Sequence, residues 1–160
     1  MPATPMTASA RYSPIGITKV YFCSAIANKS APTRAELNAG TELSGEISDI
    51  GGWEPTSDSI DTPDLANRFV GSVPGRIKAD ESSLTFYRSS NSVDVRGLLP
   101  RDTVGFIVFL DEGDVAARKM DVFPVTVASA PKDRSMEEAG RIVVNFKISS
   151  TPAENVTIPA

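Results

Sequence analysis

The chain has 160 residues, 41% hydrophobic and 22% charged, a composition typical of one globular domain that buries a core of its own. Histidine is absent and cysteine occurs once, which excludes the usual histidine-based catalytic and metal sites and any internal disulfide, so we expect no enzyme, no cofactor and no metal. No stretch of about 18 apolar residues indicates a membrane span, and the first residues lack a signal-peptide layout.

The net charge of −4 is unevenly distributed along the chain. Residues 35–67 contain eight acids and no Lys or Arg, which leaves 12 acids against all 16 basic residues elsewhere. Such an acidic stretch is either a solvated face or one side of a complementary contact. Because no basic cluster with interleaved aromatic residues occurs, we expect no specific grip on nucleic acid.

The beginning of the chain predicts an arm, a strand and a short helix. Residues 1–14 are rich in Ala, Thr, Ser and Pro, which indicates a flexible N-terminal arm. The β-branched and aromatic run over 15–23 predicts a strand. Thr33 and Glu36 have the spacing of a capping box and a glycine follows at 40, so we predict a helix over 33–39.

The acidic part of the chain predicts a strand followed by a loop. Alternation over 41–50 is typical of a strand with one wet face. Two glycines end it, and residues 51–67 show neither helical nor strand periodicity, so we interpret them as a long loop. The chain's single tryptophan, Trp53, lies in this polar segment. Its position indicates docking, either on the protein's own core or on another subunit.

The next elements are two strands over 68–73 and 76–89, a short helix over 92–99 and a strand over 103–110. The last of these is apolar at every position from Gly105 to Leu110. A strand with one solvated face would alternate, so both faces of this strand should be covered. One small domain would have difficulty covering both, which favours a neighbouring subunit on the second face.

The end of the chain predicts two further strands. Residues 111–114 are interpreted as a hairpin turn, and the strand over 120–129 contains Pro124, which predicts an edge or a bulge. The alternation over 141–150 predicts a closing strand, and residues 152–160 are expected to form a C-terminal tail.

Residues 15–151 therefore predict one mainly β domain, an antiparallel β-sandwich or barrel of seven to eight strands with one or two short flanking α-helices. Its motifs do not favour chemistry. Asp58, Asp61 and Asp64 are three residues apart, but on a loop this spacing defines no geometry for paired carboxylates, so we interpret them as solvated acids.

The order of elements, together with a series of short fragments, resembles a known family. The fragments are Pro32-Thr33-Arg34-Ala35-Glu36-Leu37, Gly51-Gly52-Trp53, Val73-Pro74-Gly75, Ser83-Leu84-Thr85-Phe86-Tyr87, Val93-Asp94-Val95-Arg96, Gly105-Phe106-Ile107-Val108-Phe109-Leu110 and Lys147-Ile148-Ser149-Ser150-Thr151-Pro152. Over nearly its whole length the chain is similar to the major tail tube protein of long, non-contractile-tailed bacteriophages (the siphovirus tail tube family). A similar fold is shared by the tube proteins of contractile tails and of type VI secretion.

The resemblance implies a structural virion protein, assembled in the host cytoplasm, whose hexameric rings stack into a hollow tube. Its implied partners are itself, the tape measure protein, the tail terminator and distal tail proteins, and DNA in transit. The N-terminal arm and the long loop would make contacts between rings. The loop residues concerned are Gly51, Gly52, Trp53, Glu54, Asp58, Asp61 and Asp64.

An acidic channel is also expected. Family tube lumens tend to be acidic, and a wall of like charge lets DNA slide where a basic wall would hold it. We hypothesise that Glu42, Glu46 and Asp49 face the lumen.

Two other functions are open at this stage. The first is another virion component, such as a capsid decoration or head-tail joining protein, which would also be rich in β-structure but would not polymerise alone. The second is a monomeric β-sandwich binding module, for example one for carbohydrate, that uses Trp53 as a stacking platform.

Overall fold

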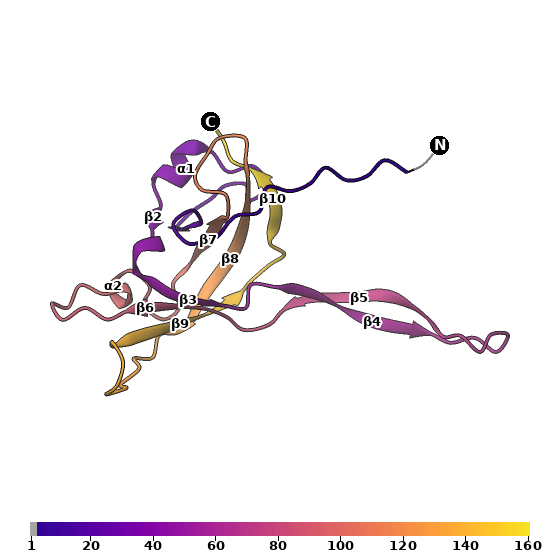
Figure 1. The fold of residues 1–160 in the computed structure, drawn as a ribbon. Helices are drawn as coiled ribbons and strands as arrows, with labels where there is room; N and C mark the ends of the chain where they lie inside the picture. The colour runs from indigo at the N-terminus through magenta and orange to yellow at the C-terminus, as the bar shows by residue number, and fades with distance from the viewer. Residues whose placement is uncertain (1–2) are drawn as a thin grey trace.

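The structure is a computed structural model that describes residues 3–160, so the first two residues of the predicted arm lie outside it. The described chain is mainly β, with antiparallel pairing throughout its strands, as predicted (Figure 1). In chain order the elements are β1 (Lys19–Cys23), α1 (Arg34–Asn38), β2 (Thr41–Glu42), the 3-10 helix η1 (Ser44–Glu46), β3 (Ile47–Gly51), β4 (Pro55–Thr62), β5 (Gly71–Ala79), β6 (Ser82–Tyr87), α2 (Val95–Leu98), β7 (Val104–Leu110), β8 (Lys119–Ser129), β9 (Arg141–Ile148) and β10 (Ala153–Thr157). Within residues 3–160, no helix is both long and apolar enough to cross a membrane.

The main sheet has eight strands and is strongly curled. Its order is β2-β1-β7-β8-β9-β6-β3. Strand β10 pairs with the first part of β8, and β9 pairs with the last part, on the same side. The two edge strands, β2 and β3, are joined by residues 43–46 alone. Because four residues span only a short distance, the sheet must bend until its edges approach each other without pairing.

The core lies inside this curl. It contains aromatic and branched side chains from both halves of the chain, which face each other across the bent sheet. Its members are Val20, Phe22, Leu43, Trp53, Leu84, Phe86, Leu99, Ile107, Phe109, Phe123, Val125, Val127, Ile142, Val144 and Phe146.

A second cluster covers the outer face of the same sheet. On β7, Ile107 and Phe109 belong to the inner core, whereas Val108 and Leu110 belong to the outer cluster. That cluster is completed by Leu37 of α1 and by Ile158 after β10. The prediction that both faces of this strand are covered is confirmed, but the chain covers the second face itself, and the expectation that a neighbouring subunit does so is wrong.

The short helix α1 follows its sequence signals. The Thr33 hydroxyl accepts a hydrogen bond from the Glu36 amide, and the Glu36 carboxylate accepts one from the Thr33 amide at 2.7 Å. A Cβ on Gly40 would lie 2.7 Å from Cys23 Sγ, so glycine lets the chain leave the helix close to β1. The helix therefore lies where its leucine can cover the outer face of the sheet.

Several predicted boundaries are wrong, most of them in the acidic region. The single strand predicted over 41–50 is two strands on opposite edges of the sheet, separated by η1. The chain turns there because the Val20 amide donates to Ser44 Oγ at 2.9 Å, which holds η1 beside β1. The loop predicted over 51–67 contains β4. Of the strand predicted over 68–73, the first half is a turn and the second half is the start of β5.

Other corrections concern lengths. The strand predicted over 76–89 is divided between β5 and β6, and the helix predicted over 92–99 is reduced to the single turn of α2. The C-terminal tail predicted over 152–160 contains β10, because after a short interruption the chain resumes pairing with β8.

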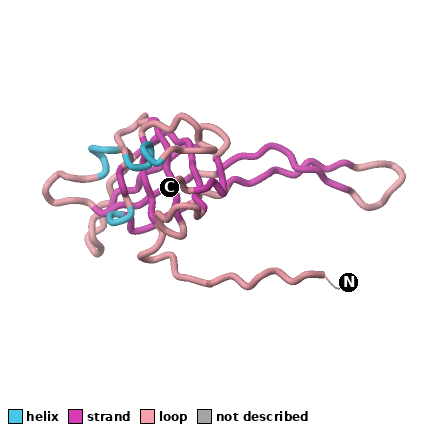
Figure 2. The backbone as a smooth tube through the Cα atoms, turned by 90° about the horizontal axis from the view of Figure 1, so that it is seen from above, coloured by secondary structure: helices cyan, strands magenta, loops and turns pink. Residues whose placement is uncertain are grey.

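Strands β4 and β5 form a separate two-stranded sheet that projects from the body. Figures 1 and 2 show this hairpin leaving one end of the body, with the N-terminal segment running out on the same side. The molecule therefore consists of a packed body and two projections.

Candidate assembly surfaces

The β4–β5 hairpin is the largest feature that lacks a partner in the described chain. Its strands pair from Pro55 opposite Ala79 to Thr62 opposite Gly71, with one bulge on the way. At about 3.4 Å per residue, the eight residues of β4 extend about 27 Å. Both of its faces are open to solvent, which a two-stranded sheet on its own tolerates poorly.

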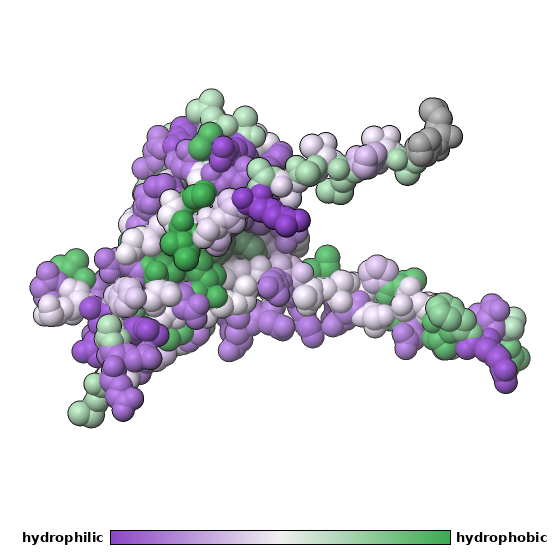
Figure 3. All heavy atoms as spheres, in the orientation of Figure 1, coloured by the Kyte–Doolittle hydropathy of each residue, from purple (hydrophilic) through white to green (hydrophobic). Residues whose placement is uncertain are grey.

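Apolar side chains are exposed along the hairpin and gather near its tip (Figure 3). Ile60 and Val73 are register partners and share one face, whereas Ile77 lies opposite Ser57 on the other face. At the tip, Leu65 is fully exposed and Phe69 is 83% exposed. An exposed cluster of this kind marks a contact surface.

The turn at the tip is organised by Asp64. One of its carboxylate oxygens accepts hydrogen bonds from the amides of Ala66 and Asn67, both at 2.8 Å. This Asx-type cap shapes the tip and holds Leu65 and Phe69 outside the turn. Asp64 was predicted as a contact residue between rings, and its carboxylate has this structural role in the single chain.

The base of the hairpin is anchored in the body through Trp53, which is 8% exposed. Its indole Nε1 donates to Ser83 O at 3.1 Å, and its ring packs edge-on against Phe109 and Phe123. Of the two alternatives predicted for this residue, docking on the protein's own core is observed. A buried indole offers no stacking platform, which argues against the carbohydrate-binding alternative.

The neighbouring glycines serve the same anchor. Gly52 has a positive φ of 79°, and a Cβ there would collide with the backbone of Glu81. A Cβ on Gly51 would lie 2.9 Å from Ser83 Oγ. Gly51, Gly52 and Trp53 therefore position the hairpin on the body, and their predicted contact with another ring stays a prediction.

The remaining predicted contact residues lie exposed on or beside the hairpin. Glu54 is at its base. Asp58 and Asp61 are an odd number of residues apart in β4, so they point to opposite faces, and Asp58 forms an ion pair with Lys78 at 3.4 Å. These acids are thus distributed along the hairpin and form no common site.

The three acids predicted to line a channel are divided between two places. Glu42 pairs with Lys19 at 2.8 Å and borders one groove together with Glu46. Asp49, on β3, borders a different groove of about 300 Å³ between β3 and the turn at 14–18. The split of the predicted strand explains this, because its two halves lie on opposite edges of the sheet.

The N-terminal segment is extended and exposed from residue 3 to the turn before β1. Its fixed point is Tyr12, whose hydroxyl donates to Asp111 O at 3.0 Å, and Thr18 donates to the same carbonyl. Met6 and Ile15 are almost fully exposed. This segment is the second candidate contact surface of the chain.

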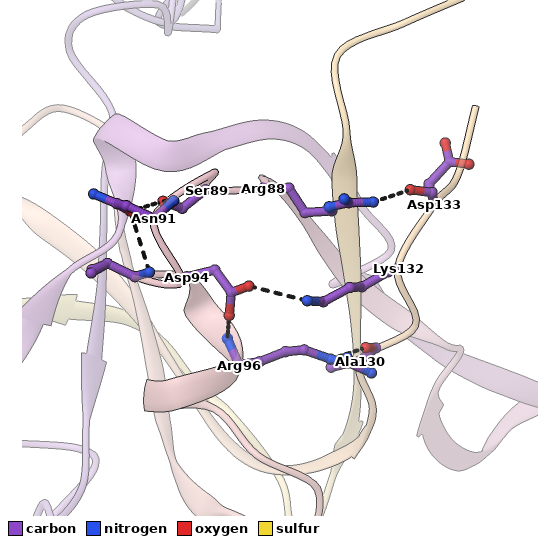
Figure 4. A network of polar contacts seen from close by, with 9 residues as sticks. Arg88, Ser89, Asn91, Asp94, Arg96, Ala130, Lys132 and Asp133 are labelled. Atoms are coloured by element: carbon purple, nitrogen blue, oxygen red, sulfur yellow. Dashed lines mark hydrogen bonds and ion pairs between the residues drawn. The ribbon is translucent and has the colours of Figure 1, made fainter. Parts of the chain in front are cut away.

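A polar network fixes the opposite end of the body (Figure 4). Asp94 accepts from the Arg96 amide at 3.1 Å and pairs with Lys132 at 3.5 Å. Arg96 Nε donates to Ala130 O at 2.8 Å, and Arg88 reaches Asp133 O. These contacts tie the loop before α2 to the connection between β8 and β9.

A second ionic cluster lies over the outer face of the sheet. Arg34 binds Asp114 through two nitrogens at 2.5 and 2.6 Å, and Tyr21 donates to the same carboxylate at 3.0 Å. The hydrogen bond from Arg34 lowers the pKa of Asp114. Burial, assisted by Asp114, raises the pKa of Tyr21 to about 12. This cluster holds α1 against the turn after β7.

The sequence-based interpretation missed β4 and the exposed apolar residues of the hairpin. Ser, Thr and Asp dominate β4, and neither face is buried, so no period-2 pattern appears. Leu65 and Phe69 were the available signal, since two large apolar side chains in an otherwise polar segment without periodicity indicate a surface that needs a partner.

The chain is similar to a known protein family and to solved structures. The profile of a family described as phage tail tube protein matches residues 4–160. A chain in the cryo-EM structure of the anti-feeding prophage (AFP) baseplate, 6-fold symmetrised, is similar with a TM-score of 0.57 at 10% identity, over 91% of this chain and 95% of that chain. The SPP1 Dit protein, a hub adsorption protein of phages that infect Gram-positive bacteria, gives a TM-score of 0.43 at 14% identity, over 84% of this chain and 50% of that chain. No curated protein matches in sequence.

Proposed function

The chain belongs to the phage tail tube protein family and is thus a structural component of a phage tail, and we propose that six copies form a ring and that rings stack into the hollow tube of a long, non-contractile tail. The proposal rests on one observation, the β4–β5 hairpin. It carries exposed apolar residues on both faces and at its tip, and these have no covering partner within residues 3–160.

The hairpin favours stacking over other uses because of where it projects. It leaves the body at one end and extends about 27 Å, beyond the reach of the body's own side chains. A contact between a projection on one copy and a different surface on the next is heterologous, so it repeats without closing. Such a contact builds an open stack.

The N-terminal segment is proposed as the second contact between copies. It is extended, exposed and tied to the body only near Tyr12, so it can order itself on a neighbour without disturbing the core. In the assembled tail the implied neighbours are further copies of the chain, the tape measure protein inside the tube, and the tail terminator and distal tail proteins at its ends. Assembly would take place in the host cytoplasm.

We propose that the channel wall is acidic and that Asp49 contributes to it. Of the three predicted lumen acids, Glu42 is neutralised by Lys19, and both Glu42 and Glu46 border an apolar groove. Asp49 is exposed on an edge strand. A carboxylate facing the channel would repel DNA phosphates and let the DNA slide during ejection.

The test removes the hairpin and leaves the body intact. Pro55 and Ala79 are opposite each other, so an Asn-Gly turn can replace residues 56–78 and close the two strands at that point. We expect the purified full-length chain to form rings or hollow filaments in negative-stain microscopy at high concentration. The shortened variant should stay folded and form no filaments, so that only monomers or single rings appear in sedimentation velocity.

Two outcomes would contradict the proposal. Featureless monomers of the full-length chain at every concentration would favour a capsid decoration or head-tail joining role. Tubes formed by the shortened variant would show that the hairpin is not the stacking contact. Circular dichroism of the shortened variant is the control, since its body must keep the β-rich spectrum for the result to count.

A further inference from the structure

An apolar groove of about 500 Å³ lies beside α2. Figure 1 shows α2 at the end of the body opposite the hairpin. One wall is formed by residues 41–46, and the other by the end of β6, the following loop and α2. The groove exists because β3 begins only at Ile47. Before that residue the chain turns away as η1, which leaves the last part of β6 without a strand on that side.

The groove combines an apolar lining with an acidic rim. Leu43 and Phe86 are buried members of the core that also contribute to its lining. Tyr87, Val93 and Leu98 line it as well and are exposed. Glu46 is exposed beside them, and within residues 3–160 its carboxylate has no ion-pair partner.

The wall that carries Val93 and Leu98 is held in place by the network of Figure 4. Asp94 caps α2 through the Arg96 amide and pairs with Lys132, and its side chain is 11% exposed. A groove whose wall is already fixed loses little conformational entropy when it binds a partner. It is therefore suited to receive a segment of complementary shape and charge.

The tip of the hairpin has the complementary chemistry. Leu65 and Phe69 are exposed on either side of Arg68. Among residues 3–160, Arg68 forms no ion pair. The nearby Asp64 carboxylate accepts hydrogen bonds from the amides of the turn. The tip thus offers two apolar side chains and a free positive charge to a groove that offers apolar walls and a free negative charge.

We propose that this groove receives the hairpin tip of a second copy of the chain, with Leu65 and Phe69 against Tyr87, Val93 and Leu98, and Arg68 beside Glu46. The inference rests on the proposed function and names the receiving surface of the stacking contact. The tip and the groove lie at opposite ends of the molecule, so each copy can bind one neighbour with its tip and another with its groove.

Disulfide trapping tests this contact in the full-length chain. The double variant Leu65→Cys with Val93→Cys places one thiol on the tip and one on the groove wall. These positions lie at opposite ends of a single chain, so only two different copies can form the bond. Native Cys23 does not interfere, because burial raises its pKa to about 11 and keeps it a protonated, inaccessible thiol.

After mild oxidation of assembled protein, the 65/93 variant should give a ladder of linked copies on non-reducing gels, and each single variant should give dimers at most. The control pair is Leu65→Cys with Ile50→Cys, which places the second thiol in the groove between β3 and residues 14–18. A ladder from the 65/50 pair, or none from 65/93 in protein that forms tubes, would overturn this inference and leave the proposed function intact. An unmodified chain that never assembles would refute the proposed function itself.

A charge exchange gives an independent measurement. Arg68→Glu and Glu46→Arg should each raise the critical concentration for assembly about two- to fivefold, in line with an exposed ion pair. The double variant should return it close to the original value. Effects of the two changes that simply add would contradict the pairing of these side chains.

Discussion

The body and the hairpin use the same antiparallel pairing and differ in what lies on their faces. In the body, β7 is covered on one face by the core around Trp53 and on the other by Leu37 and the C-terminal segment. In the hairpin, β4 and β5 have solvent on both faces. The body therefore has the buried surface that stabilises a fold, whereas the hairpin has exposed apolar surface, which we propose is buried on assembly.

This difference separates two kinds of substitution. Changes in the body should lower the free energy of unfolding of the monomer and affect assembly only through the loss of folded protein. Changes at the hairpin tip should weaken assembly and leave the monomer as stable as before. The following experiments test that separation, from the largest expected effect to the smallest.

Trp53→Ala should have the largest effect, because Trp53 lies in the core of the body and anchors the base of the hairpin. It would remove a ring packed against three phenylalanines and a hydrogen bond to Ser83 O, and leave a cavity. We expect a loss of about 3–5 kcal/mol in the free energy of unfolding, measured by urea denaturation of the monomer. A loss below about 1 kcal/mol would show that the hairpin base is not part of the core.

Leu37→Ala tests whether the outer face of the sheet is covered within one subunit. Leu37 is 1% exposed and packs in the outer cluster. Its truncation should cost about 2–4 kcal/mol in the unfolding of the monomer at low concentration. An unchanged monomer with impaired assembly would mean instead that a neighbouring subunit covers this face.

Phe69→Ser tests the opposite side of the comparison. The ring is exposed in the single chain, so the free energy of unfolding should change by less than about 0.5 kcal/mol. Burial of the ring in a contact is worth about 1.5–3 kcal/mol, which predicts a rise of about tenfold or more in the critical concentration for assembly. Val115→Ser, another exposed apolar position, is the matched control and should assemble normally. If Phe69→Ser lowered both the free energy of unfolding and the ability to assemble, the separation of the two regions would be contradicted.

Asp114→Asn tests a small, pH-dependent part of the body's stability. Because Arg34 lowers the pKa of Asp114 in the folded state, the ionic cluster contributes above the unfolded value of about 3.9 and is lost as the pH falls through the folded pKa. At pH 7 the variant should be less stable by about 1 kcal/mol, and the difference from the original chain should shrink towards pH 3. Thermal unfolding at both pH values measures this, and a constant difference would argue against the Arg34 contact.

The elements that the sequence predicted well have their signals in adjacent residues or in a buried face. The capping box of Thr33 and Glu36 located α1, because both partners lie within one helical turn. The alternation over 141–148 located β9, and the apolar run from Gly105 located β7 as a strand covered on both sides. What covered the outer face was not predictable, because α1 and β10 reach it from distant parts of the chain.

The contact role of the segment after Gly51 stays a prediction, and the structure of that segment was not predicted. The segment after Gly51 was identified as the contact region, but its strand, the burial of Trp53 and the cap made by Asp64 each depend on partners elsewhere in the fold. The groove beside α2 was not predicted at all. It arises where β3 begins and the chain leaves the sheet as η1, a boundary that the alternation over 41–50 concealed.

The sequence by itself determined that the chain is β-rich, with a packed core and an acidic segment that carries its single tryptophan. These properties follow from composition and from periodicity, which appears wherever one face of an element is buried. The tertiary structure alone decided that this segment is a projecting hairpin. A strand with solvent on both faces carries no periodic pattern, so only the pairing of β4 with β5 and the anchoring of Trp53 against Ser82 and Ser83 define it.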